Sequence, residues 1–397
     1  MSNTVLTDTK VTRKALSILH QKLNFIATIN RQYDDSFAKS GAKIGTTLKI
    51  REPNQYTVRT GATIDVQDTT EASQTLTVAT QKGVDIHFTS TEMTMSIDDF
   101  SERVLEPAMA VLAANIEYDV MSNVYKDVYQ AVWTPGSAIT YNDVLDAAVL
   151  MDRSLAPTGK RYANLNPADK VDLIQDTKGL FAAQSELNKQ FVEGYIGREA
   201  GFDFLMNTMW PGHTCGSEDG SYVVNTSTGI TSGSATVAVT GGTGTLAAGD
   251  ILTIAGVTSV HPETKVSTGV LQQFVVTAAY AGGAGNITVS PTPVTSGATQ
   301  NVSIASAGAS KAVVVAGTAS GTDTTSLLYH KDAFTFVSAD LDVPQGTHMA
   351  RREVYDGISL RFVSDYDIIN DRFLGRFDIL YGYKTLRPQW ATRLHFN

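Results

Sequence analysis

Apolar residues recur at steps of four over one long stretch in the first third of the chain. Within residues 98–129, six of them stand four positions apart, which places their side chains on one face of a helix. Pro107 is tolerated in a first turn, so we expect the main helix to begin there and to run to Tyr129. At 1.5 Å per residue it would be about 34 Å long. The six residues are Ala108, Leu112, Ile116, Val120, Val124 and Val128.

A second helix is predicted over residues 10–31, and it contains basic residues but no acid. Two interpretations stay open for it. It could pack on its own domain with a solvated basic face, or it could be an arm that docks on a neighbouring subunit or an acidic partner. Further helices are predicted from Thr140 and from Asn166, which suits an N-cap followed by Pro167 in the first helical position.

Alternation of apolar and polar residues predicts strands on either side of a polar stretch. Residues 46–60 and 74–90 alternate in this way, and the segment between them reads "TGATIDVQDTTEASQ". We expect the two to form a β-ribbon. Because an isolated two-stranded ribbon buries little surface and is marginally stable, it needs another surface to lie on.

The same alternation returns near the C-terminus. Residues 358–362 and 377–383 flank the turn-rich segment "SDYDIINDRFLG", so an antiparallel pair is predicted there. This pair is expected to belong to the same body as the helices that precede it in the chain.

Between these parts, residues 222–322 carry only four formal charges: Asp250, Glu263, Lys265 and Lys311. Valine-rich runs separated by Gly- and Ser-rich turns predict a small β-barrel or sandwich. Since helices and strands of ordinary charge density flank it, we interpret it as a module inserted into one domain. The runs cover residues 234–240, 250–257, 272–280, 286–294 and 311–317.

The composition of the chain narrows the range of functions that it could have. The formal charge of −9 argues against general affinity for nucleic acid, although an acidic protein can enclose DNA without gripping it. The single cysteine, Cys215, excludes an intramolecular disulfide and fits a reducing compartment. The sequence shows neither a signal peptide nor an apolar run long enough for a membrane span.

No motif for catalysis or metal binding emerges. His213 and Cys215 stand two apart in "PGHTCG", but a zinc site needs further ligands that the sequence does not assign. The acids of "DYDIIND" lack the glycine and the closing glutamate of a calcium loop. "GGTGTLAAGD" lacks the Lys-Ser/Thr end of a phosphate loop, and no GxSxG elbow occurs. We therefore expect a protein that is not an enzyme, with no catalytic residue, cofactor or metal.

The C-terminal "ILYGYKTLRPQW" resembles the closing motif of tailed-phage major capsid proteins with the Hong Kong 97-type fold, through Tyr381, Gly382, Arg387 and Pro388. The likeness is closest to coat proteins of short-tailed phages that carry an inserted β-barrel. Five further segments resemble that family: "LAANIEYDVMSNV" (112–124), "NPAD" (166–169), "AGFDFL" (200–205), "GDILTIAGV" (249–257) and "VSPTPV" (289–294).

The resemblance implies an α+β capsid fold with an N-arm, an extended loop, a peripheral domain with a spine helix, an axial domain and an inserted all-β barrel. The implied divisions are an N-terminal arm (1–35), an extended loop or β-ribbon (36–96), the first part of the spine, peripheral and axial domain (97–221), the inserted barrel (222–322) and the second part of the axial and peripheral domain (323–397).

The implied function is a major capsid protein that self-assembles, as hexamers and pentamers, into an icosahedral shell around phage double-stranded DNA. The implied partners are other copies, a scaffolding protein, a portal and DNA bound without sequence specificity, with no membrane. Assembly would occur in the bacterial host cytoplasm and the product would be the virion capsid. Charges on the ribbon are the candidate subunit contacts: Lys49, Arg51, Arg59 and Asp65. Deleting residues 55–80 is expected to leave a soluble fold that forms no shell.

Other functions remain open. An encapsulin-like compartment of the same fold would enclose enzymes in place of DNA, and the inserted barrel argues against it. A β-rich tail or adhesin protein is disfavoured by the long amphipathic helices, and a hydrolase by the missing motifs.

Overall fold

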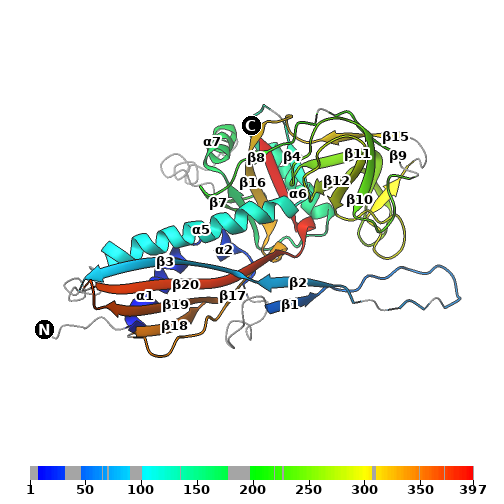
Figure 1. The fold of residues 1–397 in the computed structure, drawn as a ribbon. Helices are drawn as coiled ribbons and strands as arrows, with labels where there is room; N and C mark the ends of the chain where they lie inside the picture. The colour runs from blue at the N-terminus through cyan, green and yellow to red at the C-terminus, as the bar shows by residue number, and fades with distance from the viewer. Residues whose placement is uncertain are drawn as a thin grey trace. The chain divides into compact units, whose positions relative to one another are not determined.

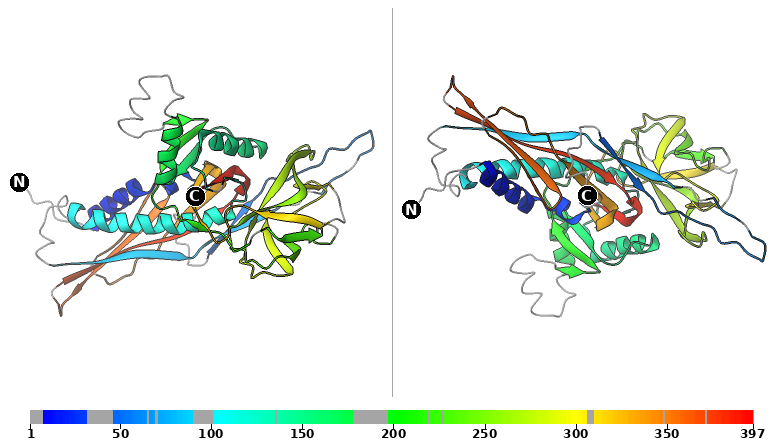
Figure 2. Two further views of the ribbon diagram at one scale, coloured as in Figure 1. Left: turned by 90° about the horizontal axis from the view of Figure 1, so that it is seen from above. Right: turned by 90° about the horizontal axis from the view of Figure 1, so that it is seen from below.

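The computed structural model describes residues 8–31, 46–64, 66–68, 71–89, 101–134, 136–177, 197–218, 220–225, 228–305, 310–347, 349–370 and 372–396. The chain divides into two compact units (Figures 1 and 2). Unit 1 comprises Met1–Arg51, Ser73–Val120 and Phe334–Leu386, and unit 2 comprises Glu52–Ala72, Met121–Ala333 and Arg387–Asn397. The predicted contact residue Asp65 lies outside the described residues.

A sheet built around the long strand β20 forms the centre of unit 1 (Figure 1). β20 pairs antiparallel with β3 along residues 372–381, with β19 along 372–378 and with β17 along 380–385. The β19–β20 pair confirms the antiparallel pair predicted around "SDYDIINDRFLG". The strands are β3 (Thr80–Thr89), β17 (Phe334–Ala339), β18 (Met349–Tyr355), β19 (Ile358–Asp367) and β20 (Arg372–Thr385).

The predicted ribbon is only partly right. β1 (Thr46–Arg51) pairs with β2 (Ser73–Val78), as expected, but β3 follows one residue later and pairs with β20. Alternation identifies a strand without identifying its partner, so β3 was wrongly assigned to the ribbon. Leu76 and Val78 are buried with Leu380 and Val337, and the deletion of residues 55–80 would therefore also remove core side chains.

The basic helix predicted over residues 10–31 is interrupted. α1 (Asp8–Lys22) ends before Asn24, and the single turn α2 (Phe25–Thr28) follows. The buried carboxylate of Glu117 accepts hydrogen bonds from the backbone N–H groups of Asn24 and Ile26 and so caps this turn. The apolar face of α1 is buried in unit 1 beside β18 and β19, which is the first of the two interpretations given for this helix.

The long helix is confirmed, with shifted ends. α5 (Glu106–Val124) begins one residue before Pro107, after a π-helical turn (Ser101–Leu105). It ends in a 3₁₀ turn, η3 (Tyr125–Asp127), short of the predicted Tyr129. All six apolar residues spaced four apart are buried, so the periodicity identified the face that packs.

In unit 2 a mixed sheet packs against two helices. Its strands lie in the order β4-β21-β16-β5-β7-β6, and β8 pairs with β16. The bounds are β4 (Ala131–Trp133), β5 (Arg161–Leu165), β6 (Arg198–Glu199), β7 (Phe202–Met206), β8 (His213–Thr214), β16 (Thr322–His330), β21 (Ala391–Phe396), α6 (Tyr141–Arg153) and α7 (Pro167–Thr177). Short 3₁₀ turns, η4 (Lys331–Ala333) and η5 (Pro388–Trp390), adjoin them.

Both helices of unit 2 start where the sequence predicts, and each start has a capping residue. The Asn166 side chain accepts from the N–H of Ala168 at 3.0 Å, as an N-cap should. Thr140 and Asp143 form a capping box, in which the Asp143 carboxylate accepts from the Thr140 N–H at 2.8 Å.

The charge-poor module is a closed barrel of six strands. β12-β13-β10-β9-β15-β11 run in that order, and β11 pairs with β12 to complete the ring, with β14 beside β11. Two of its strands, β9 and β14, were missed because each is too short to show alternation. The bounds are β9 (Tyr222–Asn225), β10 (Thr236–Gly241), β11 (Ile251–Val260), β12 (Ser267–Val276), β13 (Gly285–Ser290), β14 (Val302–Ile304) and β15 (Ser310–Val315).

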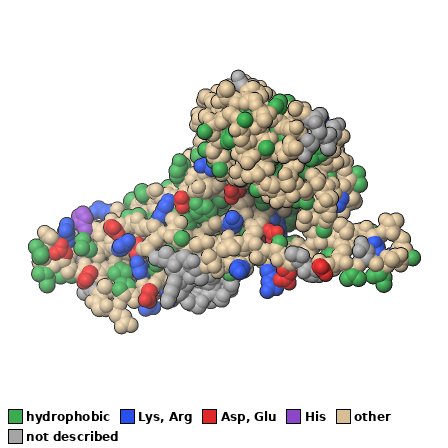
Figure 3. Space-filling model, turned by 45° about the vertical axis from the view of Figure 1, so that its right-hand side comes forward, with side chains coloured by type: hydrophobic (Ala, Val, Ile, Leu, Met, Phe, Trp, Pro, Cys, Tyr) green, Lys and Arg blue, Asp and Glu red, His purple; other side chains and the backbone are tan. Residues whose placement is uncertain are grey.

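The barrel is filled by aliphatic and aromatic side chains, among them Tyr222, Ile254 and Phe274. On the face shown in Figure 3, the rounded lobe that contains it carries few charged side chains. None of the helices that the structure describes combines the length and apolarity needed to cross a bilayer.

Candidate functional site

The segment that joins β1 to β2, residues 52–72, is the first candidate for a binding surface. The Glu52 N–H donates to the carbonyl of Ala72 at 2.8 Å. The Thr57 N–H donates to the Gln67 side chain at 2.7 Å, and the Gln67 amide donates back to the Thr57 carbonyl at 2.6 Å. These bonds bring the two halves of the segment together without forming a strand pair.

Large apolar side chains of this segment are exposed. Tyr56 is 56% exposed, and the other three range from 78% to 95%. Exposed apolar side chains gathered on one segment are typical of a surface that another molecule covers. The four residues are Tyr56, Val58, Ile64 and Val66.

Three of the four predicted contact residues are exposed on the described chain. Lys49 and Arg51 stand two apart on β1, so they share one face, while Ile50 between them is buried on the other. Arg59 lies in the 52–72 segment, and its guanidinium donates to the carbonyl of Gly61. The structure therefore places one pair of cations together on β1.

The β1–β2 hairpin is attached to unit 1 by a close backbone approach. A Cβ added to Gly382 would lie 2.3 Å from the backbone oxygen of Thr77, so only glycine lets β20 pass β2 here. The Gln74 amide also donates to the carbonyl of Leu386 at 3.0 Å. This gives a structural reason for the glycine in the "YGY" motif.

The junction between the barrel and the mixed sheet of unit 2 is the second candidate. The side-chain amide of Gln273, on β12, bonds both backbone groups of Ala131: it accepts from the N–H at 2.9 Å and donates to the carbonyl at 2.8 Å. β4 is an edge strand, so Gln273 satisfies edge groups that would otherwise be open. Beside this contact, Trp133 packs on the buried cluster of Ala131, Ile251 and Ala316.

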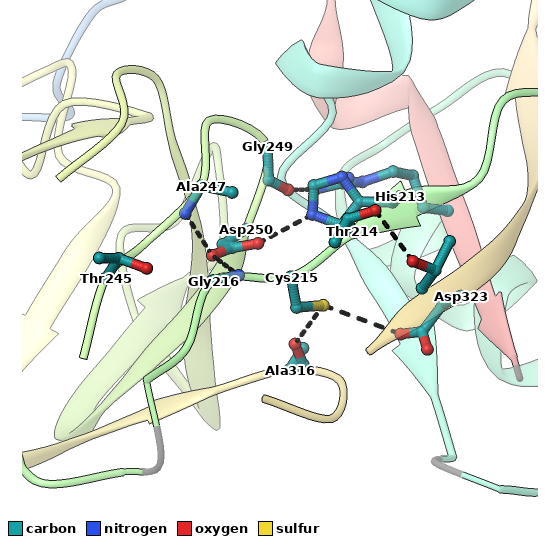
Figure 4. A network of polar contacts seen from close by, with 12 residues as sticks. His213, Thr214, Cys215, Gly216, Thr245, Ala247, Gly249, Asp250, Ala316 and Asp323 are labelled. Carbon is teal, nitrogen blue, oxygen red and sulfur yellow. Dashed lines mark hydrogen bonds and ion pairs between the residues drawn. The ribbon is translucent and has the colours of Figure 1, made fainter. Parts of the chain in front are cut away.

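A buried histidine–aspartate pair lies at the same junction (Figure 4). His213 Nε2 and Asp250 Oδ1 are 2.8 Å apart. The Tyr125 hydroxyl is 3.1 Å from His213 Nδ1. A neutral imidazole that donates through Nε2 and accepts through Nδ1 satisfies both bonds. The other Asp250 oxygen accepts from the N–H groups of Gly216 and Ala247, at 3.0 and 2.7 Å.

Arg393 completes this network from β21. Its side chain is fully buried, donates to the Gly249 carbonyl at 2.7 Å and lies over the Tyr125 ring at 5.6 Å. Burial, which penalises the charged form, lowers the pKa of Arg393 to about 10. The guanidinium stays charged at neutral pH and ties β21 to the turn that enters β11.

His213, Cys215 and Asp250 place potential metal ligands within 4.8 Å of one another. The structure thus supplies a third candidate ligand, Asp250, that the sequence did not identify. However, burial, with the charges of Asp250 and Asp323, raises the pKa of the Cys215 thiol to about 12, and a thiol must lose its proton to bind zinc. With the Arg393 charge beside it, this arrangement favours a hydrogen-bonded anchor over a metal centre.

Sequence reasoning missed Gln273, Asp250 and Arg393 as anchors. Asp250 and Arg393 offered one signal, since each is a charge inside an apolar strand or run, "GDILTIAGV" and "ATRLHF". A charge in such a place is often buried and paired. The sequence around Gln273 gives no such signal.

A family model described as "P22 coat protein - gene protein 5" matches residues 21–393. No curated protein sequence matches the chain.

Several solved structures are similar at low sequence identity. One from Mycobacterium phage Che8 is 12% identical, with 94% of this chain and 90% of that chain covered and a TM-score of 0.48. The capsid of cyanophage P-SCSP1u is 12% identical, with 91% and 85% covered and a TM-score of 0.43. A virus-like particle from Pyrococcus furiosus is 8% identical, with 97% and 98% covered and a TM-score of 0.40. Since these scores are low, the family match alone carries the assignment.

Proposed function

Because the chain belongs to the P22 coat protein family, whose members are phage capsid proteins, we propose that its icosahedral shell encloses double-stranded phage DNA. The chain is a major capsid protein with a Hong Kong 97-type fold and an inserted barrel, as predicted. Hexamers and pentamers of this chain would form the shell in the host cytoplasm, with a scaffolding protein and a portal as assembly partners.

The observation that carries the proposal, beyond the family match, is the exposed apolar surface of residues 52–72. Tyr56, Val58, Ile64 and Val66 are costly to leave in water, and covering them on a neighbouring copy would release that cost. Each subunit contact can be modest, because closure of the shell makes many contacts cooperate.

We propose that parts of the chain have distinct roles in this shell. Residues 1–35 would act as the N-terminal arm, 36–96 without β3 as the extended loop, and 222–322 as the inserted domain. The bodies 97–221 and 323–397 would supply the spine, peripheral and axial parts. The contacts at the junction, above all those between Gln273 and Ala131, support a barrel that moves together with the mixed sheet of unit 2 as one rigid body.

The decisive experiment replaces Val58, Ile64 and Val66 with serine. All three are exposed, so the subunit should stay folded and soluble, while sedimentation and electron microscopy should show few or no shells. A matched control replaces three exposed valines elsewhere, Val171, Val266 and Val314, and should form shells. Normal shells from the first variant would overturn the role given to this segment.

The charged contacts have their own test. Lys49→Glu, Arg51→Glu and Arg59→Glu should each slow assembly if they meet acids of a neighbour, and Asp65→Lys should do the same for a basic partner. Light scattering during assembly measures the rate. A variant that assembles at the wild-type rate removes its residue from the proposed contacts.

The compartment alternative differs in its contents. Shells purified from phage-infected cells should contain DNA, which nuclease-protected ultraviolet absorbance detects. Shells that repeatedly contain one enzyme and no nucleic acid would favour the encapsulin-like function.

A further inference from the structure

A cleft of about 360 Å³ lies inside unit 2, where the barrel meets α6 and the turn η5. Strand β12 supplies one wall through Val270 and Leu271, and the end of α6 supplies another through Leu150 and Arg153. A volume of this size lies within the usual range of ligand pockets, fits a short piece of peptide and far exceeds that of a simple inorganic anion.

The charges that line this cleft are of one sign. Among the residues that the structure describes, Arg153 and Lys265 are the basic residues that line it, and none of the lining residues is an Asp or Glu. The whole chain has 40 acidic and 31 basic residues, so its net charge is negative. The charged side chains of this cleft are positive, which is the opposite sign. A local positive potential inside an acidic protein attracts carboxylates.

Both cations lack an acidic partner within the part of the chain that the structure describes. No ion pair joins Arg153 or Lys265 to a carboxylate of those residues, and the Lys265 ammonium donates over a long distance, 3.4 Å, to the Gln300 carbonyl. Desolvation by burial lowers the pKa of Lys265, which an arriving carboxylate would offset.

The walls are hydrogen-bonded and partly apolar. The Asn301 amide bonds the Thr292 carbonyl and the Val294 N–H, both at 2.8 Å, and the Gln300 amide bonds the Val302 carbonyl at 3.2 Å. These bonds tie neighbouring parts of this wall together, and a pre-formed wall lowers the entropic cost of binding a ligand. Leu271 is 40% exposed and offers an apolar surface to a ligand.

We propose that this cleft binds an acidic peptide segment of a partner polypeptide, with Arg153 and Lys265 pairing its carboxylates and Leu271 packing on an apolar side chain. Two cations are too few for a nucleic-acid site, which must neutralise many phosphates. The exposed Leu271 and the size of the cleft favour a peptide over a free anion. This site goes beyond shell formation and does not depend on it.

The test uses the purified full-length protein, as shells and as unassembled subunits, and a fluorescein-labelled octapeptide of alternating Glu and Ala. Fluorescence anisotropy should show binding that weakens as salt is added, whereas an octapeptide of alternating Gln and Ala should bind much more weakly. Arg153→Gln and Lys265→Gln should each reduce the affinity about fivefold, as expected for one partly exposed ion pair.

Lys311→Gln is the matched control, because Lys311 is a barrel lysine that does not line the cleft. It should bind the Glu-Ala peptide as the wild type does. Equal binding of both peptides, or an equal loss in all three variants, would overturn the proposal. Inorganic phosphate that displaces the peptide at low millimolar concentration would overturn it in favour of a small-anion site.

A second copy of this chain is the remaining occupant to distinguish. If Arg153→Gln and Lys265→Gln impair self-association of the unlabelled protein, while the Glu-Ala peptide neither binds nor competes, the partner is another copy and the proposal is wrong. Wild-type shells from both variants, with peptide binding weakened, would support it and leave the shell function untouched.

Discussion

The side-chain amide of Gln273 forms two hydrogen bonds with the backbone of Ala131, at 2.9 and 2.8 Å, and so imitates one step of strand pairing. One residue thereby joins the barrel to the edge of the neighbouring sheet. Both partners belong to unit 2.

Replacing Gln273 with alanine should loosen the barrel without unfolding it. Two hydrogen bonds are lost and the Ala131 groups lose their partner, so we expect a loss of about 1–3 kcal/mol in the free energy of unfolding. Hydrogen exchange should show reduced protection of the Ala131 amide. Gln81→Ala, at an exposed position of β3, serves as the control and should leave that amide unchanged.

Gly382→Ala should detach the β1–β2 hairpin from β20. The new Cβ would lie 2.3 Å from the Thr77 oxygen, which forces the strands apart and should cost about 2–4 kcal/mol. Urea unfolding measures the loss. Gly159→Ala, where an added Cβ meets nothing within 4 Å, is the matched control, and an equal effect of both substitutions would contradict the explanation.

Stability should fall at alkaline pH because of Cys215. Burial raises the pKa of its thiol to about 12 in the folded protein, whereas an exposed thiol titrates at about 8.5. Between these values the folded state keeps a proton that the unfolded state has lost, so the free energy of unfolding decreases as pH rises through that window. Below this pH window, the protonated thiol contributes fully to the free energy of unfolding.

Urea unfolding of the wild type and of Cys215→Ser at several alkaline pH values isolates this effect from other titrating groups. The wild-type curve should be steeper by at most about 1.4 kcal/mol per pH unit. Identical slopes would show that the thiol titrates normally in the folded state. The native thiol should also react slowly with a disulfide reagent at mildly alkaline pH.

Asp356→Asn should weaken the attachment of the N-terminal helix. The Asp356 carboxylate contacts His20 at 2.8 Å and Arg31 at 2.7 Å. Although burial opposes it, these bonds lower the pKa of Asp356, so its contribution is present above the ordinary Asp pKa and is lost as pH falls through the depressed value.

The expected loss is small, about 0.5 kcal/mol, because the side chain is 36% exposed and solvent screens the pair. Asparagine suits this position, since Asp356 has a φ of 49° and Asn tolerates the left-handed region. Limited proteolysis should cut α1 faster in the variant than in the control Glu263→Gln. Unchanged cleavage would rule out a role for this pair in attaching α1.

The local pattern of the sequence was sufficient to predict several secondary-structure elements. Steps of four identified α5 and its buried face, the sequence pattern placed the start of α6 near Thr140, and capping chemistry identified the start of α7 at Asn166. Alternation around one turn identified β19 and β20. Low charge and repeated valine runs identified the barrel as a module. These features succeed because helix periodicity, capping and hairpins involve residues that are close in the sequence.

Tertiary structure alone decided which distant strands pair and which polar groups are buried. β3 alternates like a ribbon strand, yet its partner is β20, nearly three hundred residues away in the chain. Gln273 looks like an ordinary polar residue of the barrel, and Asp250 is marked only as a charge inside an apolar run, yet they bond Ala131 and His213 outside it. Alternation and composition specify how much of a side chain is buried on average, whereas the choice of partner depends on surfaces that only long-range folding brings together.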